Sequence, residues 1–154
     1  MKPPALIQEA VATLCTRFAS GDYGLTPVID IGALVANADG TADEKELDML
    51  RYLFDALLGA RLGRDALAHL VRSSVQVILE AGIEPRARFL ADILVDCDAV
   101  EEGLTVALGV AFASEGLSEP ERGVIDLIAR AARLPQGRLE ALTAKVERSM
   151  EAAS

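Results

Sequence analysis

The chain has 154 residues, of which 51% are hydrophobic and 4% aromatic, and its formal net charge is −9 at pH 7. This length suits one domain with a sizeable buried core, and the hydrophobic content excludes disorder over most of the chain. The negative charge argues against nucleic acid and anionic membranes as partners, and it suits a cation or a basic protein surface. Simple solubility is the alternative explanation of the acidic balance.

Apolar residues recur at helical spacing along the chain, and no alternating run predicts a strand. The first helix is expected to end within Ser20–Gly24, where a glycine tolerates a left-handed backbone. Thr26 and Pro27 are expected to open the second helix, because Pro at a first helical position loses no hydrogen bond. The expected helices cover residues 5–19, 27–38, 44–59, 64–80, 85–95, 99–113, 119–133 and 136–151. The sequence therefore predicts one all-α domain over 1–154, a bundle of seven or eight helices.

Two of the expected helices are almost free of charged residues. In helix 27–38 the interior charge is Asp30, near the helix start, where the helix dipole favours a carboxylate. The second half of helix 99–113 has no charge. A helix that is apolar on all sides belongs in the centre of a bundle, so we expect both helices to be central. The helix over 85–95 is instead expected to bury one stripe, which includes Phe89 and Leu90.

A repeat with an offset of 75 residues relates two segments of the chain. The residues that both copies keep are Val35/Val110, Ala36/Ala111, Ala38/Ala113, Glu44/Glu119 and Glu46/Glu121. In each copy an apolar helix ends, an acidic segment follows and a second helix begins. We name residues 39–43 the first elbow and residues 114–118 the second elbow. The repeat predicts two pseudo-symmetric helix-turn-helix halves, at about 27–58 and 102–133.

Helix capping is one explanation of the acidic residues at the elbows. Asp43 with Glu46, and Ser118 with Glu121, both match the capping box. In that motif a short polar side chain at the helix cap accepts a hydrogen bond from the backbone N–H three residues later. The glutamate at that later position in turn accepts a hydrogen bond from the backbone N–H of the cap residue. Capping leaves Asp39 and Glu115 unexplained, because both precede the caps.

Metal binding is the other explanation. Carboxylates at the end of one helix, at the next cap and one turn further on can converge on a hard cation. Oxygen ligands suit Ca²⁺, Mg²⁺ or Mn²⁺ rather than zinc, for which the chain offers one His and no paired Cys. The site is not an EF-hand, because Val35 would occupy the first ligand position.

Two helical units with such elbows, each preceded by an Ala-rich apolar helix, resemble the tellurite-resistance TerB family over about residues 30–134. Proteins of that family are all-helical, and acidic residues at their two elbows have been proposed to bind metal ions. At the first elbow the resemblance implies Asp39, Asp43 and Glu46 as ligands.

At the second elbow the resemblance implies Glu121, together with Ser118. The chain departs from the family pattern there, because Ser114 stands where the symmetric Asp is expected. Glu115 is displaced by one position and is a candidate substitute for that Asp. We therefore expect a metal chiefly at the first elbow.

Catalytic motifs are absent from the sequence. His69 is the sole histidine, no nucleophile motif lies near it, and we expect it to be a partly exposed helix residue. Cys15 and Cys97 lie far apart without CxxC spacing, which favours reduced thiols. The N-terminus lacks an apolar signal region and no stretch is long enough to span a membrane, so we expect a cytoplasmic protein.

Three functions are compatible with these observations. The first is a non-catalytic TerB-like stress-response protein that binds a divalent cation at its elbows. The second is a metal-independent protein–protein interaction module, with an unidentified partner, whose elbows are only helix caps. The third is a metal-assisted hydrolase, which would need Asp39 and the acids of the second half together in a deep pocket.

Overall fold

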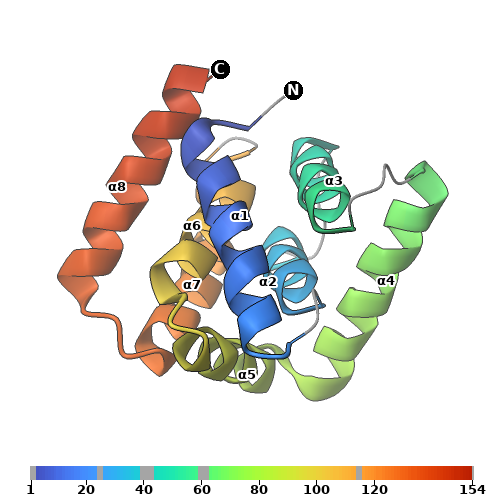
Figure 1. Cartoon of the computed structure of the whole chain (residues 1–154), viewed down its shortest axis with the longest axis horizontal. Coiled ribbons are helices and arrows are strands. Elements are labelled where there is room, and N and C mark those ends of the chain that lie inside the picture. Colours follow the sequence, from blue (N-terminus) through green and yellow to red (C-terminus); the bar gives the residue numbers. More distant parts are fainter. Residues whose placement is uncertain (1–2, 24–25, 39–43, 59–62, 114–115, 154) are drawn as a thin grey trace.

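The computed structural model describes residues 3–23, 26–38, 44–58, 63–113 and 116–153. Eight α-helices lie in these ranges, and no strand occurs among them (Figure 1). The helices are α1 (Ala5–Ser20), α2 (Thr26–Ala36), α3 (Glu44–Leu58), α4 (Arg64–Ala81), α5 (Ile83–Asp96), α6 (Val100–Ala111), α7 (Glu119–Ala131) and α8 (Gln136–Ala153). The predicted all-α class is thus confirmed. None of these helices is long and apolar enough, within the described ranges, to cross a membrane.

Three helices end two residues earlier than the hydrophobic pattern predicts. The expected helix 27–38 ends at Ala36, the expected helix 99–113 ends at Ala111, and the expected helix 119–133 ends at Ala131. All three close on a tighter turn, in which an N–H donates to the carbonyl oxygen three residues earlier: Ala38 to Val35 (3.2 Å), Ala113 to Val110 (3.2 Å) and Arg133 to Arg130 (3.0 Å). Such a last turn satisfies end carbonyls without continuing the α-helix.

The two nearly uncharged helices, α2 and α6, occupy the centre of the bundle, as predicted. Figure 1 shows α4 and α8 at opposite edges of the molecule with α2 and α6 between them. Every residue from Ile29 to Ala36 and from Gly103 to Ala111 is buried. The central helix α6 packs so closely against α1 that a small residue is required where they cross. A Cβ on Gly109 of α6 would lie 2.7 Å from Cδ1 of Ile7 in α1.

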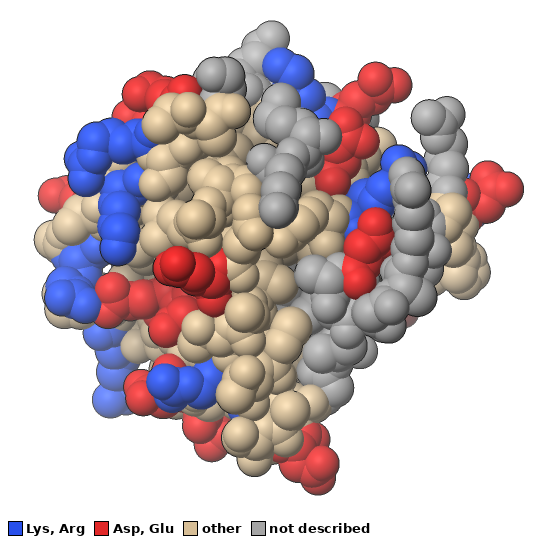
Figure 2. Space-filling model, turned by 45° about the horizontal axis from the view of Figure 1, so that its top comes forward, with Lys and Arg blue, Asp and Glu red and all other residues tan. Residues whose placement is uncertain are grey.

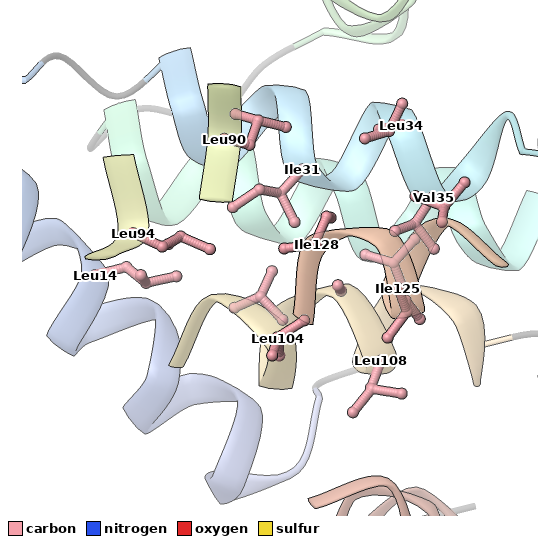
Figure 3. Close-up of a cluster of buried hydrophobic side chains, with 14 of the residues drawn as sticks. Leu14, Ile31, Leu34, Val35, Leu90, Leu94, Leu104, Leu108, Ile125 and Ile128 are labelled. Atoms are coloured by element: carbon pink, nitrogen blue, oxygen red, sulfur yellow. The ribbon is translucent and has the colours of Figure 1, made fainter. Parts of the chain in front are cut away.

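Among the described residues, fully buried aliphatic side chains of α1, α2, α3, α5, α6, α7 and α8 form the core. Figure 3 shows Leu14 of α1, Ile31 of α2, Leu94 of α5, Leu104 of α6 and Ile128 of α7 converging on one another. Removing such side chains from water is the main favourable term in folding. The core therefore lies between the central pair and its neighbours.

Asp30 has a partner that the sequence did not predict. It is 2% exposed, lies inside α2, and forms an ion pair with Arg86 of α5. A buried carboxylate needs such a partner, because the helix dipole alone does not replace lost hydration. Phe89 also differs from expectation: it is 45% exposed, and the Arg86 guanidinium lies 4.9 Å from its ring centroid.

Helices α1, α5 and α7 end in the same way, with one left-handed residue that is not glycine. These residues are Asp22 (φ 61°), Asp98 (φ 53°) and Arg133 (φ 61°). In each case the N–H of the next residue donates to the carbonyl oxygen five residues earlier. These hydrogen bonds join Tyr23 to Phe18, Ala99 to Leu94, and Leu134 to Ala129, each at 2.9 Å. This is the Schellman pattern. The first helix ends at Ser20, within the predicted segment, but the left-handed residue there is Asp22, whereas Gly21 has φ −84°.

The ends of α1 and α5 meet through polar contacts. The hydroxyl of Tyr23 donates to Oδ2 of Asp96 at 2.7 Å, and Arg17 lies 3.3 Å from Oδ2 of Asp98. A Cβ on Gly21 would lie 3.0 Å from Sγ of Cys97, so the backbone approaches closely there. The hydrogen bond to Asp96 raises the pKa of Tyr23, because it stabilises the neutral phenol.

Candidate functional site

Two of the five predicted metal ligands lie in the part of the chain that the structure describes. These are Glu46 of α3 and Glu121 of α7. Asp39, Asp43 and Glu115 lie outside the described residues, as does Ser114 of the second elbow. The predicted convergence of carboxylates at each elbow therefore stays a prediction, and the site is built here from the helices that flank the elbows.

The helix ends around the two elbows keep the offset seen in the sequence. The helix before the elbow ends at Ala36 in one copy and at Ala111 in the other. The helix after the elbow begins at Glu44 and at Glu119. Both pairs are separated by 75 residues. The two segments between these helices therefore have the same length in the chain.

Glu46 and Glu121 are buried, which is unusual for this residue type. Glu46 is 5% exposed and Glu121 is 3% exposed. Each is the third residue of its helix, where a capping box directs a glutamate back towards the helix start. The sequence predicted the position of these side chains but not their removal from solvent.

The capping box at the second elbow is confirmed. The N–H of Glu121 donates to Oγ of Ser118 at 3.2 Å, and the N–H of Ser118 donates to Oε1 of Glu121 at 3.0 Å. Ser118 has the extended backbone that caps require, with φ −73° and ψ 162°. Two backbone donors that the helix leaves without partners are thereby satisfied.

Capping uses only one oxygen of the Glu121 carboxylate. The other, Oε2, is buried and accepts no hydrogen bond from any described residue. An oxygen in that state carries the cost of lost hydration without compensation. A cation or an enclosed water molecule is the usual partner of such an atom.

The surroundings of the elbows place limits on metal chemistry. Among the described residues, no three His, Cys, Asp or Glu side chains are grouped closely enough to hold a metal ion. A complete ligand set thus requires elbow residues outside the described ranges. His69 is exposed on α4, as predicted. Figure 2 shows acidic and basic side chains mixed along one edge of the face in view, so the negative charge is not gathered there in one block.

A groove beside the second elbow was not predicted from the sequence. It has a volume of about 350 Å³ and lies between α7 and α8. Gly116 and Leu117 of the second elbow form part of its wall. Three separate segments build it, so no local motif marks it. The periodic pattern of α8 was the available signal, because only Leu139, Leu142 and Val146 of that helix are buried.

Comparison with family models, with curated proteins and with solved structures found no match to this chain. The all-α fold of the described residues therefore rests on the structure and on no matching relative. The resemblance to the TerB family stays a prediction from the elbow residues, and the function is argued below from the site.

Proposed function

We propose that this chain is a non-catalytic, TerB-like stress-response protein that binds a divalent cation at its acidic elbows. The observation that carries the proposal is Oε2 of Glu121, which is buried and accepts no hydrogen bond from the described residues. A cation in contact with this oxygen would offset its lost hydration while Oε1 continues to accept from Ser118. The ligands are oxygens, which suit Ca²⁺, Mg²⁺ or Mn²⁺.

The proposal includes a pseudo-symmetric relation between two helix-turn-helix halves. Its support is the shared offset of the helix ends and the matching burial of Glu46 and Glu121. Under this relation Asp39 and Asp43 act with Glu46 at the first elbow. Glu115 acts with Glu121 at the second elbow, where Ser114 replaces the symmetric Asp.

Thermal unfolding in Ca²⁺ or Mn²⁺, against the same buffer with a chelator, tests the proposal. At a free metal concentration of about ten times Kd, binding adds about 1.4 kcal/mol to the stability of the folded state, which is a few degrees in Tm. We expect Asp39→Asn with Asp43→Asn to remove most of this shift. Glu121→Gln is expected to reduce it, because the amide still accepts from Ser118 but carries no charge.

Glu119→Gln is the matched control, because Glu119 is exposed in the same first turn of α7. It removes one charge near the same helix end and is expected to leave the metal shift unchanged. A wild-type protein that shows no shift at millimolar metal excludes the cation site. If Glu119→Gln and Glu121→Gln lose the metal-induced shift in Tm equally, the shift depends on the net charge of the protein and not on a specific cation site.

A second function, a metal-independent interaction module whose elbows are only caps, is favoured by the capping box of Ser118 and Glu121. In that case Ser118→Ala should lower the free energy of unfolding by about 0.5–2 kcal/mol, equally with and without metal. A loss that depends on the metal contradicts this second function and supports the first.

A further inference from the structure

The groove between α7 and α8 is open because these two helices hardly meet. Helix α8 packs mainly on α6 and makes little contact with α7. In Figure 1, α8 runs along the edge of the molecule, with its far side unpartnered. The cavity between the two helices has a volume of about 350 Å³. This volume is within the range of pockets that hold small ligands or single anchoring side chains.

The base of this α7/α8 groove is apolar. Its lining includes Phe112 at the end of α6, Leu117 of the second elbow, Ile125 of α7 and Leu139 of α8. Ile125 and Leu139 are buried, whereas Phe112 and Leu117 are only partly covered. An incoming aliphatic side chain would therefore complete the cover of these two residues, which is favourable.

The margin of the groove is acidic. Asp126 of α7 and Glu140 and Glu147 of α8 contribute three carboxylates, against the single guanidinium of Arg122. Within the described ranges, none of these four side chains forms an ion pair. Glu140 and Glu147 are seven residues apart on α8, so they stand about 10 Å apart along its axis.

We propose that the α7/α8 groove binds a basic amphipathic helix of a partner protein. A leucine-like side chain enters the apolar base beside Leu117, and two basic residues about two turns apart reach Glu140 and Glu147. Charge complementarity selects this occupant. An acidic helix would place like charges against the three carboxylates, and a purely apolar helix would remove water from them without a compensating charge. The proposal gives the partner's chemistry for the interaction module described above and does not depend on a cation.

Fluorescence anisotropy with a synthetic labelled peptide tests the proposal. The peptide is a helix-forming Leu/Lys sequence with two Lys seven positions apart around a central Leu, and the buffer contains a chelator so that no metal contributes. A peptide with Glu in place of Lys is expected not to bind. The triple variant Asp126→Asn, Glu140→Gln and Glu147→Gln should weaken binding of the Lys peptide about tenfold or more. Each exposed ion pair adds only modestly to the affinity, so the fold-change is the combined loss of several pairs.

The matched charge control is Glu9→Gln with Asp48→Asn and Asp92→Asn, three exposed acids outside the groove. It makes the same change in net charge and should alter the affinity less than about twofold. Ala144→Trp fills the groove from an exposed position of α8, and it should abolish binding. Its control, Ala141→Trp, lies on the same helix outside the lining.

Three results overturn the proposal. Equal weakening by both triple variants means that the peptide follows net charge alone. Full affinity in Ala144→Trp means that the peptide binds elsewhere. A concentration-dependent dimer that Ala144→Trp dissociates, seen by sedimentation, makes a second copy of the chain the occupant. The metal titration and the Ser118→Ala measurement change no residue of the groove lining and follow unfolding rather than peptide binding, so they stand or fail separately.

Discussion

The backbone N–H of Ser118 donates to Oε1 of Glu121 at 3.0 Å, and the glutamate that accepts this bond is 3% exposed. One carboxylate thus closes a helix N-terminus and also brings a second oxygen into the protein interior. Glu46 lies at the matching third position of α3 and is 5% exposed. At Glu121 a local structural role is thus joined to the proposed binding of a cation.

Substitution of Glu121 separates these two roles in the absence of metal. Glu121→Ala loses the bond to Ser118 and should lower the free energy of unfolding by about 1 kcal/mol. Glu121→Gln keeps an acceptor and removes the buried charge, so it should be at least as stable as the wild type. Urea unfolding in a chelating buffer measures both. Equal destabilisation by Gln and Ala would contradict a capping role for Oε1.

The Asp30–Arg86 ion pair should be costly to break from one side. Arg86→Met leaves the carboxylate of Asp30, which is 2% exposed, without its cation. Loss of one partner of a buried pair lowers stability by about 3–5 kcal/mol. Adding Asp30→Leu should recover much of that loss, because no buried charge remains. A double-mutant cycle in urea gives the coupling, and additive losses would contradict the role of the pair.

The left-handed residue after α7 offers a gain in stability. Arg133 has φ 61°, a conformation that costs a residue with a Cβ about 1–2 kcal/mol. Arg133→Gly removes this strain at some cost in unfolded-chain entropy, so it should stabilise the protein by about 0.5–1 kcal/mol. Arg133→Ala is the control, because it removes the side chain but keeps the Cβ. A similar gain in both variants would assign the effect to the guanidinium instead.

Tyr23 should make stability fall at alkaline pH. Its hydrogen bond to Asp96 raises the pKa above the ordinary value of 10.0. Above that value the unfolded chain releases the phenolic proton first, so the folded state holds more protons and stability decreases as pH rises. Tyr23→Phe should reduce this loss in urea unfolding measured on either side of the ordinary value.

A direct titration checks the cause of the raised pKa. The chain has two tyrosines, so Tyr52→Phe leaves Tyr23 as the single tyrosine. The tyrosinate absorbance of this variant should develop above the ordinary pKa. Adding Asp96→Asn should move the titration to lower pH, because the carboxylate that accepts the hydrogen bond is gone. An unchanged titration would assign the shift to burial alone.

Local interactions explain why much of the fold could be predicted from the sequence. Apolar periodicity placed every helix, and the near absence of charge placed α2 and α6 in the centre. The capping box at Ser118 was likewise readable, because its partner is only three residues away. The helix ends at Ala36 and Ala111 were missed, since apolar character continues through a turn that is no longer α-helical.

The amino-acid sequence by itself determined where the helices lie, which two are central and how α7 begins, because each depends on residues within one or two turns of one another. Tertiary structure alone decided the partner of Asp30, which lies 56 residues away on α5, and the exposure of Phe89. It also decided the burial of Glu46 and Glu121 and opened the α7/α8 groove. These features arise from how helices distant in sequence pack together, and helical periodicity carries no information about which faces meet.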